Sequence, residues 1–313
     1  MNETRRVTRR AVLATGGALG VGALAGCIGA SGRAAASVLS AGSLLVVFAE
    51  DVGPAFERDT DYGFRGEFHG SKTVMRMVED GQKHPDVVVS ADVGLLRDAL
   101  ESGSAPRSDW DVVFAANEVG VTYNPETAVG TRLEAGEPWY EVLRDPDAEV
   151  ARSDPDLDPL GYRTVQLFEL AEQYYEEPGL AADLQDALRV DPEESHLLAA
   201  VETGDRAAAI AYENMAVDHD LSFVHLPPEC NFSDPQYADH YASVAYEMDD
   251  GTTVRGSPVL YAATVLDGAD NPDAGEAFLG YLLDNPDLLE SGGLVVSDSL
   301  PMGNGDVPSG VMP

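Results

Sequence analysis

In the stretch Asp111-Val112-Val113-Phe114-Ala115-Ala116-Asn117-Glu118-Val119-Gly120-Val121-Thr122-Tyr123, two apolar runs follow each other almost end to end. Both runs are rich in β-branched and aromatic residues, which favour buried strands. Two consecutive strands with no helix between them indicate that the chain crosses here from one lobe to another. This stretch therefore predicts a molecule built from two lobes.

The sequence on either side of this crossing alternates short apolar runs with amphipathic segments. Asp86-Val87-Val88-Val89-Ser90 is typical of a buried strand, and residues 44–59 have apolar side chains at helical spacing. Such alternation predicts an α/β fold with mixed, mainly parallel sheets. We expect residues 38–118 together with 255–313 to form lobe one, and residues 119–254 to form lobe two.

The composition indicates which kinds of partner this protein can bind. Acidic residues outnumber basic ones by 55 to 19, which gives a net charge of −36. A surface this negative repels phosphate backbones, so we expect no nucleic-acid partner. Lys72 and Lys83 are the only lysines. This composition is typical of a protein from a halophile, because salt near 1 M shortens the Debye length to about 3 Å. An acidic protein from an ordinary organism is the alternative.

Residues 1–27 have the pattern of an export signal. Paired arginines precede a Gly/Ala-rich apolar run, which favours a secretory signal and makes a twin-arginine route plausible. The run ends in Leu24-Ala25-Gly26-Cys27, which resembles a lipobox whose cysteine is lipidated. We expect a lipid anchor on the outer face of the cell membrane, followed by a flexible tether over 28–37. A signal anchor with an incidental cysteine is the alternative. With Cys27 lipidated, Cys230 stands alone and no disulfide forms.

Three turns between a predicted strand and a predicted helix carry the candidate binding residues. Ala41-Gly42-Ser43-Leu44 and Gly70-Ser71 each offer free N–H groups and a hydroxyl at a helix start, which suit an anion. Ligands of open α/β sheets bind at this edge of the strands. The third turn is the acidic segment 153–163. Its carboxylates could bind Ca²⁺, although it lacks the glycine and terminal glutamate of an EF-hand, or it is a generic acidic loop.

These motifs form an ordered set, completed by Asp86–Asp92, Asp158-Pro159-x-Gly161-Tyr162-Arg163, and Leu226-Pro227 near Ser233-Asp234-Pro235. The set resembles the archaeal tungstate/molybdate-binding proteins of ABC importers, of the ModA/WtpA type, from about residue 38 to residue 293. The resemblance implies a two-lobed periplasmic-binding-protein type II fold with a hinge that closes on ligand.

The resemblance also implies the ligand-binding residues. The family's oxyanion-binding serines correspond to Ser43 and Ser71, its Asp-Pro-x turn to Asp158, Pro159 and Leu160, its glutamate to Glu194, and its tyrosine to Tyr212. Glu193 is adjacent to Glu194, so the glutamate assignment remains open by one position. Asp158 and Glu194 would coordinate the tungsten or molybdenum centre and expand it from four to six oxygens. Sulfur cannot expand in this way, so the carboxylate pair would select against sulfate.

The implied function is capture of tungstate or molybdate in a cleft between the lobes, for delivery to an ABC permease and ATPase. We expect a monomer without a cofactor and without enzyme activity. A sulfate- or phosphate-binding protein on the same scaffold is one alternative, and a secreted hydrolase that uses acidic residues is another. The usual enzyme signatures are absent, and the six histidines show no metal-ligand spacing. Arg163 is assigned a structural role, because oriented dipoles suffice to hold a dianion.

Overall fold

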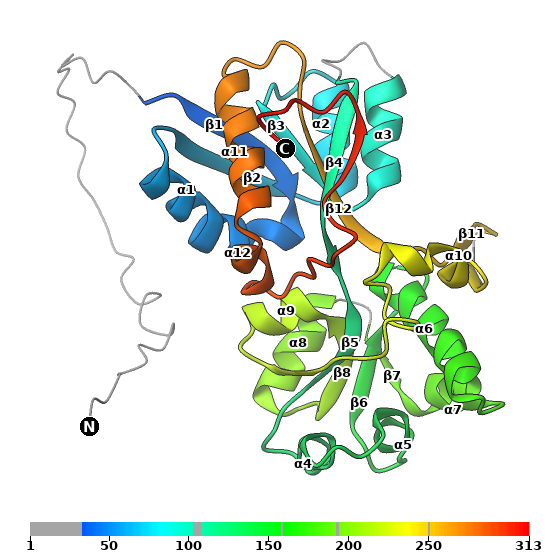
Figure 1. Cartoon of the computed structure of the whole chain (residues 1–313). Helices are drawn as coiled ribbons and strands as arrows, with labels where there is room; N and C mark the ends of the chain where they lie inside the picture. The colour runs from blue at the N-terminus through cyan, green and yellow to red at the C-terminus, as the bar shows by residue number, and fades with distance from the viewer. Residues whose placement is uncertain (1–32, 103–107, 158, 192–193, 250, 313) are drawn as a thin grey trace, which may run out of the picture. The chain divides into compact units, whose positions relative to one another are not determined.

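The computed structural model describes residues 33–102, 108–157, 159–191, 194–249 and 251–312. Two sheets dominate the fold, and Figure 1 shows β4 of the first running on into β5 of the second. The first sheet has six strands in the order β13-β4-β12-β3-β1-β2. Their bounds are β1 (Ala35–Ala41), β2 (Gly63–His69), β3 (Val87–Ser90), β4 (Trp110–Asn117), β12 (Val259–Val265) and β13 (Met302–Gly305).

Helices cover both faces of the first sheet. They are η2 (Gly42–Leu44), η3 (Val47–Val52), α1 (Gly53–Asp59), α2 (Ser71–Glu79), α3 (Val93–Ser102), α11 (Pro272–Asp284) and α12 (Pro286–Glu290). Along β3, Val87 and Val89 pack with Phe278 of α11, whereas Val88 packs with Val74 of α2 on the other face. Because both faces are buried, the strand is a continuous apolar run and not an alternating one.

The second sheet has five strands in the order β7-β6-β8-β5-β9. Its strands are β5 (Val119–Tyr123), β6 (Val150–Ser153), β7 (Arg189–Asp191), β8 (Ala208–Tyr212) and β9 (Ser222–Val224). Its helices are α4 (Ala128–Glu134), α5 (Trp139–Leu143), α6 (Pro159–Tyr175), α7 (Leu180–Ala187), α8 (Glu194–Thr203) and α9 (Glu213–Asp218). A smaller segment follows, with η4 (Pro235–Tyr237), α10 (Ala238–Tyr241) and the hairpin β10 (Ala245–Glu247) to β11 (Thr253–Arg255).

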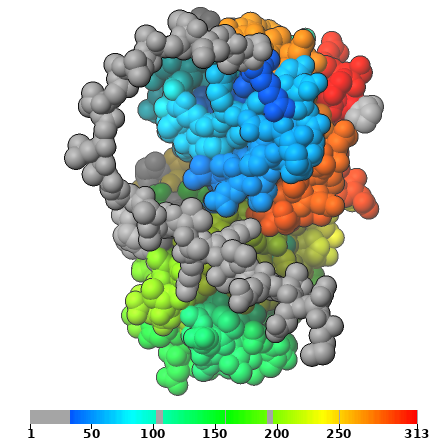
Figure 2. Space-filling view, turned by 90° about the vertical axis from the view of Figure 1, so that its left-hand side faces the viewer, coloured from blue at the N-terminus to red at the C-terminus, as the bar shows by residue number. Residues whose placement is uncertain are grey.

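The crossing predicted from the sequence is present. Only Glu118 separates β4 from β5, and these two strands belong to different sheets. The chain returns to the first sheet at β12, which inserts between β4 and β3. In Figure 2 the N-terminal and C-terminal parts of the described chain, in blue and orange-red, therefore share one half of the surface, and the green middle part occupies the other.

The α/β class and the mixed sheets are confirmed, but parallel pairing is not in the majority. Four of the nine strand pairs in the two large sheets are parallel: β1 with β2 and β3, and β6 with β7 and β8. The pairs made by β4, β5 and β12 are antiparallel. These three strands carry the chain between the sheets, so they are not part of the strand–helix–strand repeats that produce parallel pairs.

The helix predicted over residues 44–59 is divided into 3₁₀, π and α segments. Pro54 lies at the start of α1 and has no N–H to donate. The N–H of Gly53, the residue before it, bonds the carbonyl of Phe48, five residues back, as in a π-helix. The segment still buries Phe48 and Phe56 against α11, as its apolar spacing predicts.

Candidate functional site

The two candidate serines follow the ends of neighbouring parallel strands in the first sheet. Ala41, the last residue of β1, is paired with His69, the last residue of β2. Ser43 lies in the 3₁₀ turn directly after β1, and Ser71 is the first residue of α2 directly after β2. Both serines therefore lie at the carboxyl edge of the sheet, where the sequence motifs predicted them.

Each serine hydroxyl already takes part in a hydrogen bond. Ser43 is exposed, and its Oγ accepts a hydrogen bond of 3.1 Å from the hydroxyl of Tyr261 on β12. Ser71 is half-buried, and its Oγ accepts a hydrogen bond of 3.1 Å from the N–H of Ala91, just after β3. Because both oxygens act as acceptors here, the proton of each hydroxyl can point elsewhere, toward an anion.

The second sheet presents its candidates at the equivalent edge. Pro159 and Leu160 open α6, after the turn that follows β6; Pro159 is exposed and Leu160 is fully buried. Leu160 thus contributes to the core with its side chain, which leaves only its backbone as a group that could face a ligand. Asp158 lies outside the described residues.

Glu194 begins α8, which follows β7. Strand β7 pairs in parallel with β6, so the start of α8 lies on the same edge of the sheet as the start of α6. The side chain of Glu194 is not among those described, and Glu193 lies outside the described residues. The choice between the two glutamates therefore remains a prediction.

Tyr212 is the last residue of β8, and its hydroxyl accepts a hydrogen bond of 2.9 Å from Nη1 of Arg163. Both side chains are half-buried. The guanidinium of Arg163 also lies 5.5 Å from the ring centroid of Tyr162, within the range of a cation–π contact. This contact joins the first turn of α6 to the end of β8. Arg163 therefore makes a contact between two elements, as a structural role requires, and it also brings a positive charge beside Tyr212.

A closed ring of hydrogen bonds joins the two sheets at this edge. Asn214, in α9, donates from Nδ2 to the carbonyl of Ser43 at 2.8 Å. Its Oδ1 accepts from Nδ2 of Asn117 at 2.8 Å, and that amide also donates to the hydroxyl of Tyr261 at 3.2 Å. The hydroxyl of Tyr261 completes the ring through its bond to Ser43. The backbone of Ser43 is thereby tied to the helix that begins directly after Tyr212.

The arrangement supplies the groups that an oxyanion needs. Hydroxyls of Ser43, Ser71 and Tyr212, together with the N–H groups that begin α2 and α6, all belong to the carboxyl edges of parallel strands. Hydroxyl and N–H donors stabilise a dianion through oriented dipoles. The guanidinium of Arg163 beside Tyr212 brings a positive charge, which adds to the attraction for an anion.

Two features of this edge were missed in the sequence. Asn214 follows Tyr212 by two residues, but nothing in its sequence context indicates a partner 171 residues away. Ser153, the last residue of β6, is fully buried, and within the described residues its hydroxyl has no hydrogen-bond partner. A buried hydroxyl without a partner is costly, and its position at a strand end could have marked it as a further candidate donor.

Two other observations concern the reactivity of Cys230 and whether a helix can span a membrane. Cys230 is buried, and burial raises the pKa of its thiol to about 12, which keeps it unreactive. Across the part of the chain that the structure describes, no helix combines the length and the apolar character required to span a bilayer.

The family model and the similar proteins all point to solute-binding proteins. A family model described as bacterial extracellular solute-binding protein matches residues 36–287. An uncharacterized solute-binding protein from Halobacterium salinarum is 48% identical over 98% of both chains. A protein from Haloferax volcanii, provisionally named as a molybdenum-binding protein of an ABC transporter, is 41% identical over 97% of this chain and 96% of its own. The molybdate/tungstate-binding protein WtpA of Thermococcus kodakarensis is 30% identical over 70% and 68%.

Solved structures share the fold at low sequence identity. The substrate-binding domain of a provisionally assigned molybdenum ABC transporter from Clostridium difficile has a TM-score of 0.61 at 16% identity, covering 83% of this chain and 98% of its own. The periplasmic molybdate-binding protein of Azotobacter vinelandii has a TM-score of 0.55 at 13% identity, covering 83% and 99%. The sulfate-binding protein SubI of Mycobacterium tuberculosis also reaches 0.55, at 15% identity, covering 89% of both chains. These likenesses confirm the two-lobed type II fold, and the fold alone does not separate one oxyanion from another.

Proposed function

Because the chain belongs to the bacterial extracellular solute-binding protein family, we propose that it captures molybdate or tungstate outside the cell and delivers it to an ABC permease and ATPase. The observation that carries the proposal is the position of the candidate ligands. Ser43 and Ser71 follow adjacent parallel strands of one sheet, Tyr212 ends a parallel strand of the other, and Asn214 ties the two edges together. Relatives named for molybdate or tungstate binding support the choice of ligand.

The proposed ligands divide by chemistry into two groups. Hydroxyls and N–H groups donate to the oxygens of any tetrahedral oxyanion, whereas Asp158 and Glu194 offer anionic oxygens. A carboxylate beside a dianion is repulsive unless it coordinates the central atom. Molybdenum and tungsten accept such additional oxygens and sulfur does not, so the carboxylates supply the discrimination against sulfate.

Binding of sulfate or phosphate is the second candidate, favoured by the sulfate-binding protein among the structural neighbours. The family is one of binding proteins, which supports the expectation that the chain is not an enzyme. Calorimetric titration of the purified chain with molybdate, tungstate, sulfate and phosphate separates the two functions. We expect the first two anions to bind and the last two to bind more weakly. Tighter binding of sulfate or phosphate would replace the proposed ligand.

Removing the negative charge of the carboxylates tests how they act. If Asp158 and Glu194 coordinate the metal centre, Asp158→Asn and Glu194→Gln each weaken tungstate binding by about 2 kcal/mol, or about 30-fold. Sulfate binding then stays the same or strengthens. If the carboxylates only line the site, both anions bind more tightly, because a repulsive charge is gone.

Two control variants make this comparison specific. Asp147 is exposed and lies in the turn before β6, at the opposite end of the strand from the start of α6, so Asp147→Asn should leave both affinities unchanged. Glu193→Gln decides whether the glutamate ligand is Glu194 or its neighbour. Tighter tungstate binding by the Asp158 and Glu194 variants would show that the site is a general oxyanion site without metal coordination.

The proposed location is the outer face of the cell membrane, reached by export and held through a lipid on Cys27. This residue and the whole signal segment lie outside the described residues. Cys27→Ala should move the protein from the membrane fraction to the medium, because the thiol that carries the lipid is absent. Cell fractionation followed by immunoblotting measures the change, and Cys230→Ala is the matched control. A Cys27 variant that stays with the membrane would argue against lipid anchoring.

A further inference from the structure

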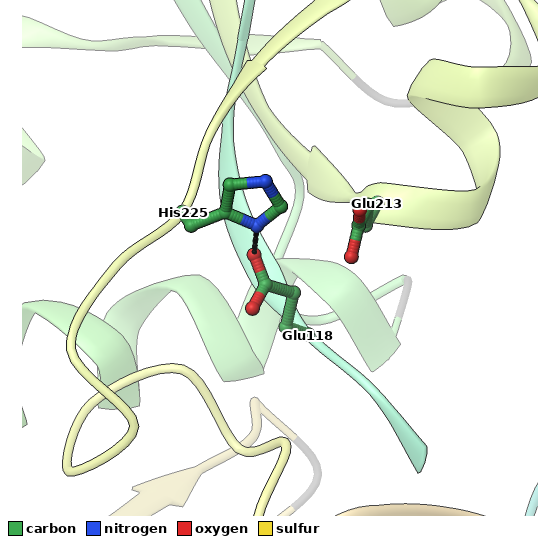
Figure 3. A group of neighbouring side chains, drawn as sticks. All are labelled: Glu118, Glu213 and His225. Atoms are coloured by element: carbon green, nitrogen blue, oxygen red, sulfur yellow. Dashed lines mark hydrogen bonds and ion pairs between the residues drawn. The ribbon is translucent and has the colours of Figure 1, made fainter. Parts of the chain in front are cut away.

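Three side chains that are far apart in the sequence meet beside the crossing between the sheets. Figure 3 shows Glu118, Glu213 and His225 with their polar ends turned toward one another. One ligand atom from each residue, two carboxylate oxygens and an imidazole nitrogen, lie within 4.8 Å of one another. Glu118 separates β4 from β5, Glu213 begins α9, and His225 directly follows β9.

The cluster is held in place by its own hydrogen bonds. Nδ1 of His225 lies 2.7 Å from one carboxylate oxygen of Glu118, and Nδ2 of Asn231 donates to the other oxygen at 3.0 Å. The carbonyl of Glu118 accepts the N–H of Glu213 at 3.1 Å. The side chain of Glu118 is 7% exposed, whereas that of His225 is 65% exposed. The cluster thus has a fixed buried end and an open end through which a small ion can enter.

The charges of the cluster are not balanced by a basic side chain. Among the described residues, no lysine or arginine forms an ion pair with Glu118 or Glu213, and the imidazole of His225 is the only basic side chain in contact with the carboxylate of Glu118. Burial raises the pKa of Glu118 to about 7; the imidazole of His225 opposes this rise, and the carboxylate of Glu213 adds to it. Burial likewise raises the pKa of Glu213. Two neighbouring carboxylates in this position are stabilised either by a proton or by a cation.

We propose that Glu118, Glu213 and His225 bind a divalent transition-metal ion of the zinc type, at a site distinct from the oxyanion site. Zn²⁺ accepts both imidazole nitrogen and carboxylate oxygen as ligands, and three protein ligands would leave a fourth position for water. Mg²⁺ and Ca²⁺ prefer all-oxygen sites, so the imidazole selects against them. The bound ion takes the place of the proton shared between Nδ1 of His225 and Glu118, and it removes the repulsion between the carboxylates.

The site has a structural consequence beyond the proposed transport function. The three ligands come from the crossing segment, from the helix that carries Asn214, and from the chain that follows β9. An ion that binds all three in the folded chain and fewer in the unfolded chain raises the free energy of unfolding. The ion therefore stabilises the segment in which the chain passes from one sheet to the other.

Zinc binding to the full, untagged chain tests the proposal. After treatment with EDTA and desalting, the chain is titrated with ZnCl₂ by calorimetry, and its melting temperature is recorded with and without zinc. We expect a melting temperature that rises with zinc, and a site that binds Mg²⁺ and Ca²⁺ more weakly. His225→Asn and Glu213→Gln should each weaken zinc binding by at least about tenfold. Both residues are partly or largely exposed, so these variants should fold.

A histidine–glutamate pair elsewhere in the same half of the molecule provides the matched control. Nδ1 of His219 lies 3.6 Å from a carboxylate oxygen of Glu202, and no third ligand joins this pair among the described residues. His219→Asn and Glu202→Gln should leave zinc binding unchanged. Equal loss of zinc in the control and cluster variants, or zinc binding retained in His225→Asn and Glu213→Gln, would overturn the proposal. Absence of zinc binding in the unaltered chain would show that the cluster holds only a proton.

Discussion

Glu118, the residue at the crossing, connects several elements through both its backbone and its side chain. Its backbone connects β4 to β5, its carbonyl accepts the first N–H of α9, and its carboxylate is bonded to His225 and Asn231. The nearby titratable groups are Glu213 and His225. Burial raises the pKa of its carboxyl from 4.5 to about 7. The folded chain therefore holds a proton in this pH window that the unfolded chain has already released.

This raised pKa predicts a pH dependence of stability. Because the folded state binds the extra proton, the contribution of Glu118 to the free energy of unfolding is present below pH 4.5 and is lost as the pH rises to about 7. The difference in free energy of unfolding between Glu118→Gln and the unaltered chain should therefore shift in favour of the variant by up to about 3 kcal/mol from pH 4.5 to about pH 7, because glutamine does not ionise. Urea unfolding in EDTA at several pH values measures the difference. The exposed Glu134 provides the control Glu134→Gln, and a pH-independent difference for Glu118→Gln would refute the prediction.

At the scale of one element, the start of α6 depends on a close approach of backbone to backbone. Gly161 lies in the first turn of this helix and is buried. A Cβ at this position would lie 2.2 Å from the carbonyl oxygen of Asp154 and 2.6 Å from the nitrogen of Pro155. The turn after β6 therefore folds back against α6, and Gly161 is required because it has no side chain. This contact also fixes the turn of α6 from which Arg163 reaches Tyr212.

Gly161→Ala should consequently destabilise the fold by about 1–3 kcal/mol, because backbone atoms must move to admit the methyl group. Denaturant unfolding measures this cost. The matched control is Gly310→Ala, since a Cβ there would meet only a carboxylate oxygen of Glu276 at 3.9 Å. Equal stability of the Gly161 and Gly310 variants would mean that the turn after β6 adapts without strain.

At the scale of the whole molecule, the net negative charge of the surface affects stability more than the individual ion pairs do. Pairs such as Arg132 with Glu137 and Arg144 with Glu141 are partly exposed, and each contributes little. With 55 acidic and 19 basic residues, carboxylates far outnumber the basic side chains that could pair with them. Their mutual repulsion opposes the compact state and is screened by salt.

The melting temperature should therefore rise when KCl is increased from 0.2 to 3 M, by at least about 3 °C, which corresponds to about 1 kcal/mol for a chain of this size. Most of the rise should occur below about 1 M, because the Debye length has fallen to about 3 Å there. A rise confined to higher concentrations would indicate exclusion of salt from the surface and not screening. A flat or falling curve would contradict the halophilic interpretation.

Local sequence patterns were sufficient for much of the fold. The apolar runs on either side of Glu118 predicted the two strands and the crossing, and the motifs at 41–44, 70–71 and 153–163 predicted the turns that follow β1, β2 and β6. These features depend on a few consecutive residues, so they can be identified in one sequence. The implied roles of Ser43, Ser71, Asp158, Glu194 and Tyr212 came from the resemblance, and their contacts with ligand remain predictions.

Only the tertiary structure decided which distant residues meet. Asn214 reaches Ser43 across 171 positions, and His225 reaches Glu118 across 107. The six histidines have no metal-ligand spacing in the sequence, yet folding brings His225 together with two glutamates. Strand order had the same origin, since β12 enters the first sheet between β4 and β3 and makes both pairs antiparallel. Periodicity determines which face of an element is buried, whereas long-range pairing depends on how all the buried faces pack at once.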